Sequence, residues 1–338
     1  MLTETCCCYK IHSMKQATLP LDLKLKKTRK QVFLEQMEQV VPWADLIALI
    51  APYYPEGQNG RPPFPLMTML RTHFMQQRFT LSDPDMEEAF FDTPLYREFA
   101  QLEEFARMPD ESTILRFRHR LEEHKLAEQI LITVNDLLSA KGLLIRAGAV
   151  VDASLIAAPT STKNKDRVRD TDMHSSKKGN QWYFGMKAHI GADAESGLVH
   201  TVRGTSGHGS DIAEGNTLLH GDESVAFGDA GYQGIEKRAD ATPDVTWHVA
   251  MRASKRKALD KDNEADAMID KAEKLKASLR AKVEHPFGVI KRQFGFVKVR
   301  YCGLEKNTAQ LVTLFALFAL FALSNLWMVR GKLLGAQA

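Results

Sequence analysis

Cysteine is scarce in this chain, and its spacing excludes two common classes of small-domain scaffold. The sequence has four cysteines, Cys6, Cys7, Cys8 and Cys302. Three adjacent residues and one distant residue form neither a disulfide framework nor a zinc-ligand spacing. The N-terminus also lacks the apolar core of a signal peptide. We therefore expect a protein of the reducing cytoplasm.

Long hydrophobic runs are also lacking, with one exception near the C-terminus. The segment Leu311–Val329 is strongly apolar and nearly long enough to cross a bilayer. Thr313, Ser324 and Asn325 interrupt it. We predict a buried core helix and no membrane partner.

No charge of one sign dominates, since 45 basic and 42 acidic groups give a net charge of +3. A local basic patch over 24–30 could follow a phosphate backbone, or it could be a solvated, frayed terminus. We place a basic arm without fixed structure at 1–29. The first thirteen residues look unlike the rest, and Met14 is an alternative start.

Hydrophobic residues make up 44% of the 338 residues, which is enough for a large core or two domains. Apolar residues recur at helical spacing between 30 and about 140. Ser82 or Asp83 can cap one helix, with Pro84 at its start. The expected helices cover 30–41, 66–79, a segment from about 83, 113–124 and 126–138.

Strand-like runs begin after Gly142. Gly191–Gly197 reads as a turn that joins the second and third runs into a hairpin. A helix is expected over 211–219 and a long charged helix from about Glu264. This order predicts a mixed α/β sheet with helices on both faces, behind an all-α N-terminal region. The expected strands cover 147–156, 182–193, 197–205, 224–229 and 246–251.

Three carboxylates stand out against this background. Asp152 interrupts the apolar run Ala149–Ile156, and Asp229 ends the run Val225–Gly228. A carboxylate in an apolar strand is costly to bury unless an opposite charge offsets it, and a pair of divalent cations would do so. Glu284 lies on the long helix, where Arg280 and Lys291 at spacings of 4 and 7 share its face. Pro286 predicts a kink there or the start of a new helix.

Several longer motifs make the chain similar to a known family. It resembles bacterial DDE transposases of the insertion sequence five group, over roughly residues 28–325. The carrying motifs are Val151-Asp152-Ala153, Ser161–Lys165, Lys177–Trp182, Phe184–Gly191, Asp229–Gly234, Arg280–Phe287 and Lys291–Gly295.

The resemblance implies a fold, an activity and partners. The fold is ribonuclease-H-like, and Asp152, Asp229 and Glu284 form a triad that binds two Mg²⁺ ions, with Mn²⁺ as a substitute. Water first nicks DNA at the element end, and the freed 3′-OH then attacks target DNA. The partners are double-stranded DNA, as terminal inverted repeats and as target, and further copies of the chain in a dimer or larger assembly. The protein would be bacterial and cytoplasmic, and on the nucleoid when bound to DNA. The implied domains are a DNA-binding region over 30–142, a catalytic domain over 143–330 and a tail over 331–338.

Basic residues supply candidate DNA contacts, each with a solvated surface as the alternative. Arg280 and Lys291 match the family's basic companions of the glutamate. The loop after Asp152 is rich in lysine and arginine. Arg116 and Arg120 on one helix would suit a DNA groove. The candidates are Arg280, Lys291, Lys163, Lys165, Lys177, Lys178, Arg116 and Arg120.

Other polar residues have plainer interpretations. We expect His189 to be a satisfied core histidine, and Ser210 or Asp211 to cap a helix. Trp182 either packs in the core or stacks on an extruded base. Two alternative functions stay open: a structure-selective nuclease on the same fold, and a non-catalytic DNA-binding derivative.

Overall fold

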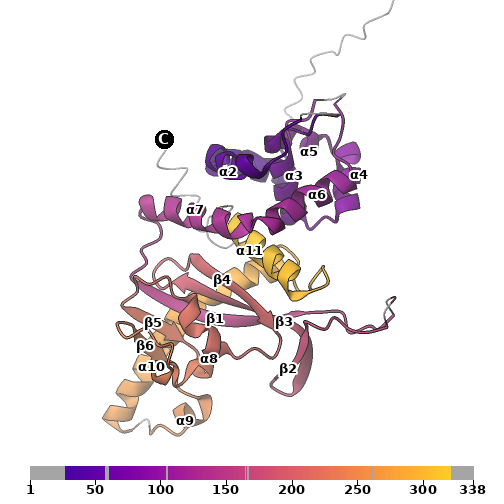
Figure 1. Cartoon of the computed structure of the whole chain (residues 1–338). Helices are drawn as coiled ribbons and strands as arrows, with labels where there is room; N and C mark the ends of the chain where they lie inside the picture. Colours follow the sequence, from indigo (N-terminus) through magenta and orange to yellow (C-terminus); the bar gives the residue numbers. More distant parts are fainter. Residues whose placement is uncertain are drawn as a thin grey trace, which may run out of the picture.

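The chain is helical up to about residue 142, and all the described strands come after this point (Figure 1). The computed structural model describes residues 27–57, 61–103, 106–163, 165, 167–260 and 262–320. Of the basic arm that we predicted over 1–29, only residues 27–29 are described, and Arg29 already begins the helix α1, so the arm ends earlier than we predicted. The predicted tail over 331–338 lies outside the described residues. The helices of the first half are α1 (Arg29–Val40), α2 (Trp43–Ile50), α3 (Leu66–Phe79), α4 (Asp83–Asp92), α5 (Pro94–Phe99), α6 (Glu111–Glu123) and α7 (Leu126–Ala140), with a 3₁₀ turn η1 (Ala51–Tyr53).

Side-chain caps explain where several of these helices start. Ser82 accepts from the amide of Asp85, and the Asp85 carboxylate accepts from the amide of Ser82, which forms a capping box at α4. Asp110 likewise accepts from the amide of Thr113 at the start of α6. The predicted cap at Ser82 is therefore confirmed. The short helices α2 and α5 were not predicted, and neither has a side-chain cap hydrogen bond.

The second half builds a six-stranded sheet in the order β2-β3-β1-β5-β6, with β4 paired to β3. The first half of β3 pairs with β2, and its second half lies between β1 and β4. The β1–β5 and β5–β6 pairs are parallel and the others antiparallel. The sheet is mixed, as predicted. The strands are β1 (Gly148–Ala157), β2 (His174–Lys178), β3 (Gln181–Asp193), β4 (Val199–Ser206), β5 (Val225–Gly228) and β6 (Thr246–Val249).

The predicted hairpin of β3 and β4 is confirmed. Our prediction of a loop that extends to Lys178 was wrong, because residues 174–178 form the strand β2. Lys178 pairs with Gln181, so only Gly179 and Asn180 form the turn. Gly179 has φ +62, the left-handed conformation that such a turn needs. The side chains of β2 are mostly exposed, so the strand has no apolar alternation to reveal it.

Helices cover both faces of the sheet. On one face the long helix α10 (Glu264–Arg292) packs on β1, β5 and β3. On the other face Val151 of β1 packs with Leu218, Tyr232 and Ile235. The remaining short elements are α8 (Asp211–Glu214), η2 (Gly215–Leu218), η3 (Ala230–Tyr232), η4 (Ile235–Lys237) and α9 (Ala253–Lys257).

Pro286 does not end the helix that carries Glu284. The helix α10 continues through Pro286 to Arg292, so our alternative of a new helix at this point was wrong. Proline costs the helix one hydrogen bond. Pro286 is buried beside Val283 and Phe287, and this packing against the sheet offsets the loss.

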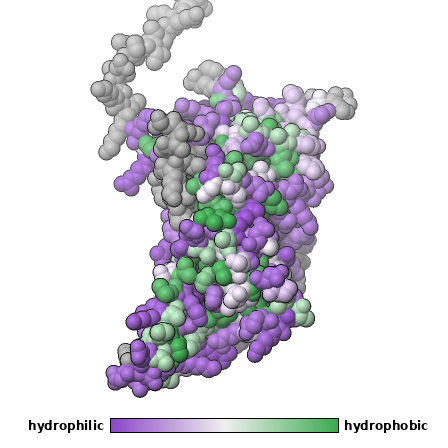
Figure 2. Space-filling model, turned by 90° about the vertical axis from the view of Figure 1, so that its left-hand side faces the viewer, coloured by the Kyte–Doolittle hydropathy of each residue, from purple (hydrophilic) through white to green (hydrophobic). Residues whose placement is uncertain are grey.

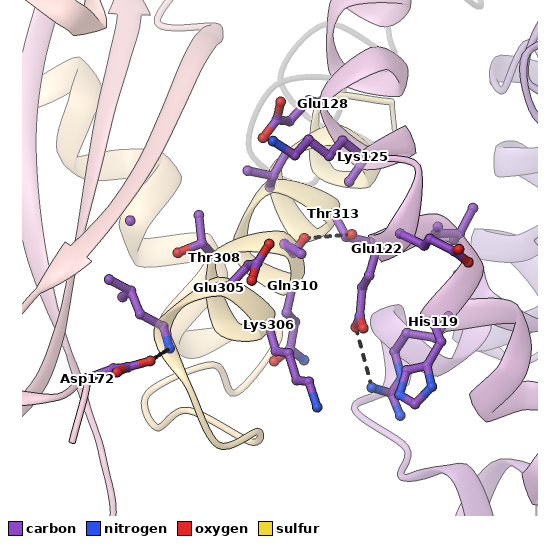
Figure 3. Close-up of a pocket in the computed structure, with 18 of the residues that line it drawn as sticks. His119, Glu122, Lys125, Glu128, Asp172, Glu305, Lys306, Thr308, Gln310 and Thr313 are labelled. Carbon is purple, nitrogen blue, oxygen red and sulfur yellow. Dashed lines mark hydrogen bonds and ion pairs between the residues drawn. The ribbon is translucent and has the colours of Figure 1, made fainter. Parts of the chain in front are cut away.

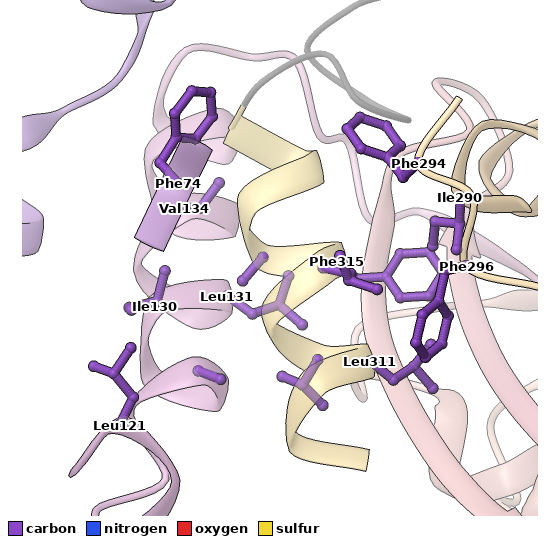
Figure 4. Packing of buried hydrophobic residues seen from close by; sticks show 14 of the residues in the cluster. Phe74, Leu121, Ile130, Leu131, Val134, Ile290, Phe294, Phe296, Leu311 and Phe315 are labelled. Carbon is purple, nitrogen blue, oxygen red and sulfur yellow. The ribbon is translucent and has the colours of Figure 1, made fainter. Parts of the chain in front are cut away.

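The last described helix, α11 (Leu304–Leu320), joins the two halves of the molecule. It packs against α7 on one side and β4 on the other. Figure 4 shows Leu131 and Val134 of α7 on one side of α11, whereas Leu311 and Phe315 of α11 point to the other side, toward Ile290 and Phe296. Because all of these side chains are buried in one cluster, the boundary that we placed at 142/143 is bridged by apolar packing.

The apolar C-terminal segment is a core helix where the structure describes it. Leu311, Val312, Leu314, Phe315 and Ala316 are buried. Within the described residues no helix is long and apolar enough to span a bilayer. Residues 321–329 of this segment lie outside the description. On the face drawn in Figure 2, hydrophilic residues cover both ends of the molecule and apolar residues form smaller patches between them.

Candidate functional site

The sheet register places Asp152 and Asp229 at equivalent positions of two neighbouring strands. The parallel β1–β5 pairing runs from Gly148 opposite Val225 to Val150 opposite Phe227. Asp152 and Asp229 each lie two residues beyond the last pair. β5 ends at Gly228 whereas β1 continues to Ala157, so the pairing stops where the two carboxylates begin. The end of a parallel pair is a common place for a ligand site in such sheets.

The residues around Asp229 hold its carboxylate in a fixed turn. Oδ1 of Asp229 accepts from the amide of Gly231 at 2.8 Å. A Cβ at Gly231 would lie 2.9 Å from that oxygen, which explains the glycine. Tyr232 is 1% exposed and packs against Gly228 and Val151. One carboxylate oxygen is therefore used by the turn, and the motif Asp-Ala-Gly-Tyr anchors the site to the core.

The ionised carboxylate of Asp152 is largely buried, which costs free energy. Its pKa is raised to about 6, chiefly by burial. The negative charges of Asp229 and Glu284 also raise the pKa, and the hydrogen bond from the amide of Ala153 and the positive charge of Arg280 lower it. The desolvation and the charge repulsion both favour a neutral form. A bound cation would reverse this balance, so the predicted divalent site fits the residues present.

Glu284 and Arg280 reach the same place from α10. Both line a cavity of about 460 Å³ with Asp152 and Asp229. Their spacing of four residues puts them on one side of the helix. The structure thus brings together the three predicted carboxylates and one predicted basic partner. The cavity is lined by Asp152, Ala153, Ser154, Leu155, Ser176, Lys177, Lys178, Lys187, Asp211, Asp229, Arg280, Glu284 and Phe287.

The predicted DNA contacts divide into two groups. Lys177 and Lys178 of β2 line the cavity, whereas Lys163 and Lys165 are exposed on the loop before it and are absent from the lining. Lys291 donates to Ser154 and to the carbonyl of Leu155, both on β1.

The helix α6 presents few free cations to a groove. Arg116 is exposed, and Arg120 donates to the carbonyl of Tyr53 at 3.0 Å. Between them, Arg118 is buried and forms an ion pair with Asp83 at 2.7 Å. The contacts of Arg116 and Arg120 with DNA stay predictions.

Lys187 and Asp211 were not predicted as site residues, although both line the cavity. Nζ of Lys187 lies 2.9 Å from Oδ1 of Asp211 and donates to the carbonyl of Gly209 at 2.7 Å. Ser210 precedes α8 without a side-chain cap hydrogen bond, and Asp211 is the first helical residue. Neither residue caps the helix, so the cap prediction was wrong, and the Asp211 carboxylate pairs with Lys187 instead. The sequence signal that could have indicated Lys187 is a charged residue among the apolar residues of β3.

Two further predictions can be compared with the structure. His189 is buried, as expected, and its Nε2 lies 2.8 Å from Oγ1 of Thr205, but Nδ1 has no hydrogen bond among the described residues. Burial lowers the pKa of His189, so the ring is held neutral. Trp182 is 70% exposed on β3, which excludes core packing for its side chain.

A larger cavity, of about 980 Å³, lies elsewhere. Figure 3 shows His119 and Glu122 of α6 on one side, with Lys306 and Gln310 of α11 on the other. Its charges are of both signs, and none of the three predicted carboxylates lines it. The smaller cavity at the strand ends is therefore the candidate active site.

The comparison with protein families identifies the class. Residues 145–320 match the model described as "Transposase DDE domain", and residues 22–120 match a second model, "Transposase domain (DUF772)". No solved structure matches the chain. The first match covers more than half of the chain, so this protein belongs to the DDE transposase family. Its sheet is accordingly ribonuclease-H-like, its enzyme class is nucleotidyl transfer, and the family implies divalent metals and a DNA partner.

Proposed function

We propose that this transposase belongs to the insertion sequence five group, cuts DNA at the ends of its own element and joins the freed 3′-OH ends to target DNA. The observation that carries the proposal is the convergence of Asp152, Asp229 and Glu284 on one cavity beside basic side chains. Phosphodiester chemistry needs hard-cation ligands and phosphate-binding groups at one place.

The three carboxylates would hold two Mg²⁺ ions, with Mn²⁺ able to replace them. Carboxylate oxygens suit these hard cations, and the repulsion that raises the pKa of Asp152 is what bound cations relieve. Such ions, when bound, activate the attacking oxygen and stabilise the leaving oxygen. Fixing Asp229 through the Gly231 amide keeps one of its oxygens oriented before any ligand arrives.

The chain's basic residues would orient the DNA. Arg280, Lys177 and Lys178 line the cavity with the carboxylates, so a phosphate beside the triad lies within their reach. Arginine can bind two phosphate oxygens at once, which fixes the strand as well as attracting it. Lys163 and Lys165 on the neighbouring exposed loop, and Lys291 behind the cavity, would add positive potential.

The helical region over 30–142 would bind the terminal inverted repeats, with Arg116 and Arg120 as candidate contacts, and the ribonuclease-H-like domain over 143–330 would carry the chemistry. Two element ends must be handled together, so we infer a dimer or larger assembly on DNA. The match of a second transposase family to 22–120 supports a separate task for the N-terminal region.

The test separates binding from chemistry. Asp152→Asn, Asp229→Asn and Glu284→Gln should each abolish Mg²⁺-dependent cleavage of DNA that carries the element ends, while binding of those ends is kept. Glu236→Gln, at an acidic residue outside the cavity, is the matched control and should cleave normally. Cleavage retained by a purified triad variant would remove that residue from the proposal. Joined donor–target products from 3′-OH ends would exclude a nuclease that lacks strand transfer.

A further inference from the structure

A second group of metal-ligand side chains lies away from the carboxylate triad. His200 is on β4, and His220 and Glu223 are in the turn between η2 and β5. One ligand atom from each of the three residues lies within 4.8 Å of the other two. None of the three residues lines the cavity of the triad.

The distances suit a small tetrahedral site. Nε2 of His220 lies 3.3 Å from Oε1 of Glu223. Metal–ligand bonds of about 2.0–2.1 Å in a tetrahedron place neighbouring ligand atoms about 3.3 Å apart. This pair therefore already has the separation of two ligands on one ion, and His200 needs a small adjustment to join them.

The Nε2 atoms of the two histidines lack hydrogen-bond partners among the described residues. His200 is 8% exposed, and its Nε2 has no hydrogen bond in the described part of the chain; the same is true of Nε2 of His220. The side chain of Glu223 is 0% exposed. A buried polar atom without a partner costs free energy, and a shared ion would satisfy both nitrogens at once.

The Nδ1 atoms of the two histidines have hydrogen-bond partners that can orient the rings. Nδ1 of His200 lies 2.9 Å from Oγ1 of Thr201, and a hydrogen bond donated by Nδ1–H to this hydroxyl leaves the lone pair of Nε2 free for a metal. The amide of Asp222 approaches Nδ1 of His220 at 3.3 Å. Metal binding needs the other tautomer of His220, in which Nδ1 donates, and Oδ2 of Asp222 lies 3.7 Å away to accept.

The carboxylate is fixed in advance by the turn. Oε1 of Glu223 accepts from the amide of His220, and Oε2 accepts from the amide of Gly221, both at 2.8 Å. Gly191 on the neighbouring strand leaves room for the His200 ring, because a Cβ there would lie 2.8 Å from Cε1. Ligands that are held before binding lose little freedom when the ion arrives.

We propose that His200, His220 and Glu223 bind one divalent transition-metal ion of the Zn²⁺ type, with water as the fourth ligand. Two imidazoles favour Zn²⁺ over Mg²⁺, which prefers oxygen ligands. The ion would tie β4 to the turn that leads into β5. Because Asp229 directly follows the last residue of β5, Gly228, the role of the ion would be to hold the strand that positions this carboxylate.

The electrostatics around the group agree with this assignment. Burial holds the pKa of His200 at about 3 and lowers the pKa of His220, so both imidazoles are neutral at pH 7 and keep a lone pair. Asp193 and Asp222 add negative charge near His220, and Arg146 adds positive charge near both rings. The inference does not depend on the transposase chemistry.

The experiment is a calorimetric titration of the full-length chain with Zn²⁺. Excess Mg²⁺ occupies the oxygen-ligand site, and the four cysteines are changed to serine so that no thiolate competes. We expect one equivalent of Zn²⁺ to bind. His220→Gln and Glu223→Gln should weaken binding by more than the roughly 10–100-fold that an outer-shell change costs. His119→Gln, at an exposed histidine of α6, should bind as the parent does.

A second measurement protects the test against variants that fail to fold. Co²⁺ in a four-coordinate site gives strong visible absorption, so the parent chain should show these bands with one equivalent of Co²⁺, whereas His220→Gln and Glu223→Gln should not. Parent protein without Zn²⁺ binding or without the Co²⁺ bands would overturn the site. Unchanged affinity in folded His220→Gln would overturn it as well.

Discussion

Lys291 of α10 donates to Oγ of Ser154 at 2.6 Å and to the carbonyl of Leu155 at 2.8 Å. Ser154 lies two residues beyond Asp152 on the same face of β1. The lysine that the family resemblance assigns to DNA therefore also fastens α10, and Glu284 with it, to the strand that carries the first carboxylate. Burial lowers the pKa of Lys291, in keeping with a half-buried ammonium.

Lys291→Met should lower the stability of the protein, because it keeps most of the aliphatic stem and removes both hydrogen bonds. A hydrogen bond from a charged donor is worth about 1.5–3 kcal/mol when buried, and because Lys291 is only partly buried we expect the two bonds together to contribute about 2 kcal/mol to the free energy of unfolding. Denaturant unfolding measures it. The control is Lys163→Met on the exposed loop, which should change little. Full stability of Lys291→Met together with lost DNA cleavage would show that the lysine serves the DNA alone.

Asp152 makes stability depend on pH in an unusual direction. Its pKa rises from 3.8 to about 6 on folding, so the folded state binds the proton more tightly than the unfolded state does. The resulting stabilisation is present below about pH 4 and is lost as the pH rises through about 6. Without divalent cations, Asp152→Asn should therefore raise the melting temperature at pH 7.5 and leave it nearly unchanged at pH 4.

Added Mg²⁺ extends this test. It should raise the melting temperature of the parent chain at pH 7.5, because a ligand that binds only the folded state stabilises it. Asp152→Asn should gain less. A parent chain that is more stable than Asp152→Asn at pH 7.5 in the absence of cations would contradict the burial cost that we assign to this carboxylate.

The mixed sheet could be predicted from the sequence, as could the positions of Asp152 within one strand and Asp229 at the end of another, because apolar runs and motif spacing are local features. The β2 strand escaped prediction since its side chains are exposed and carry no alternating pattern. Pro286 is the opposite case: a local rule predicted a kink or a new helix, and the packing of α10 on the sheet keeps one helix through this residue.

The site was predictable only in part. The three carboxylates could be selected because each stood out against its neighbours. The Lys187–Asp211 pair could not, because its members are 24 residues apart and meet only through the β3–β4 hairpin and the turn after it. The hydrogen bonds of Lys291 depend in the same way on how α10 lies on β1.

Lys187 and Asp211 should act as a coupled pair. Their side chains are 15% and 33% exposed, so the pair is partly shielded from water. Lys187→Met leaves Asp211 near Asp229 without its cation, whereas the double variant Lys187→Met/Asp211→Asn removes both charges. We expect a coupling of about 1 kcal/mol in a double-mutant cycle of unfolding free energies. Additive effects of the two substitutions would show that the contact contributes nothing.

Lys177 and Lys178 should contribute more to DNA engagement than Lys163 and Lys165, although all four are exposed lysines of one chain segment. Only the first two line the cavity with the triad. Each lysine that contacts a phosphate releases a counterion, so Lys177→Ala/Lys178→Ala should weaken binding and lower the slope of log K against log salt by about two. The matched control, Lys163→Ala/Lys165→Ala, should lower that slope less. Binding isotherms over a salt series measure both, and equal slopes for the two double variants would place the DNA path along the whole loop rather than through the cavity.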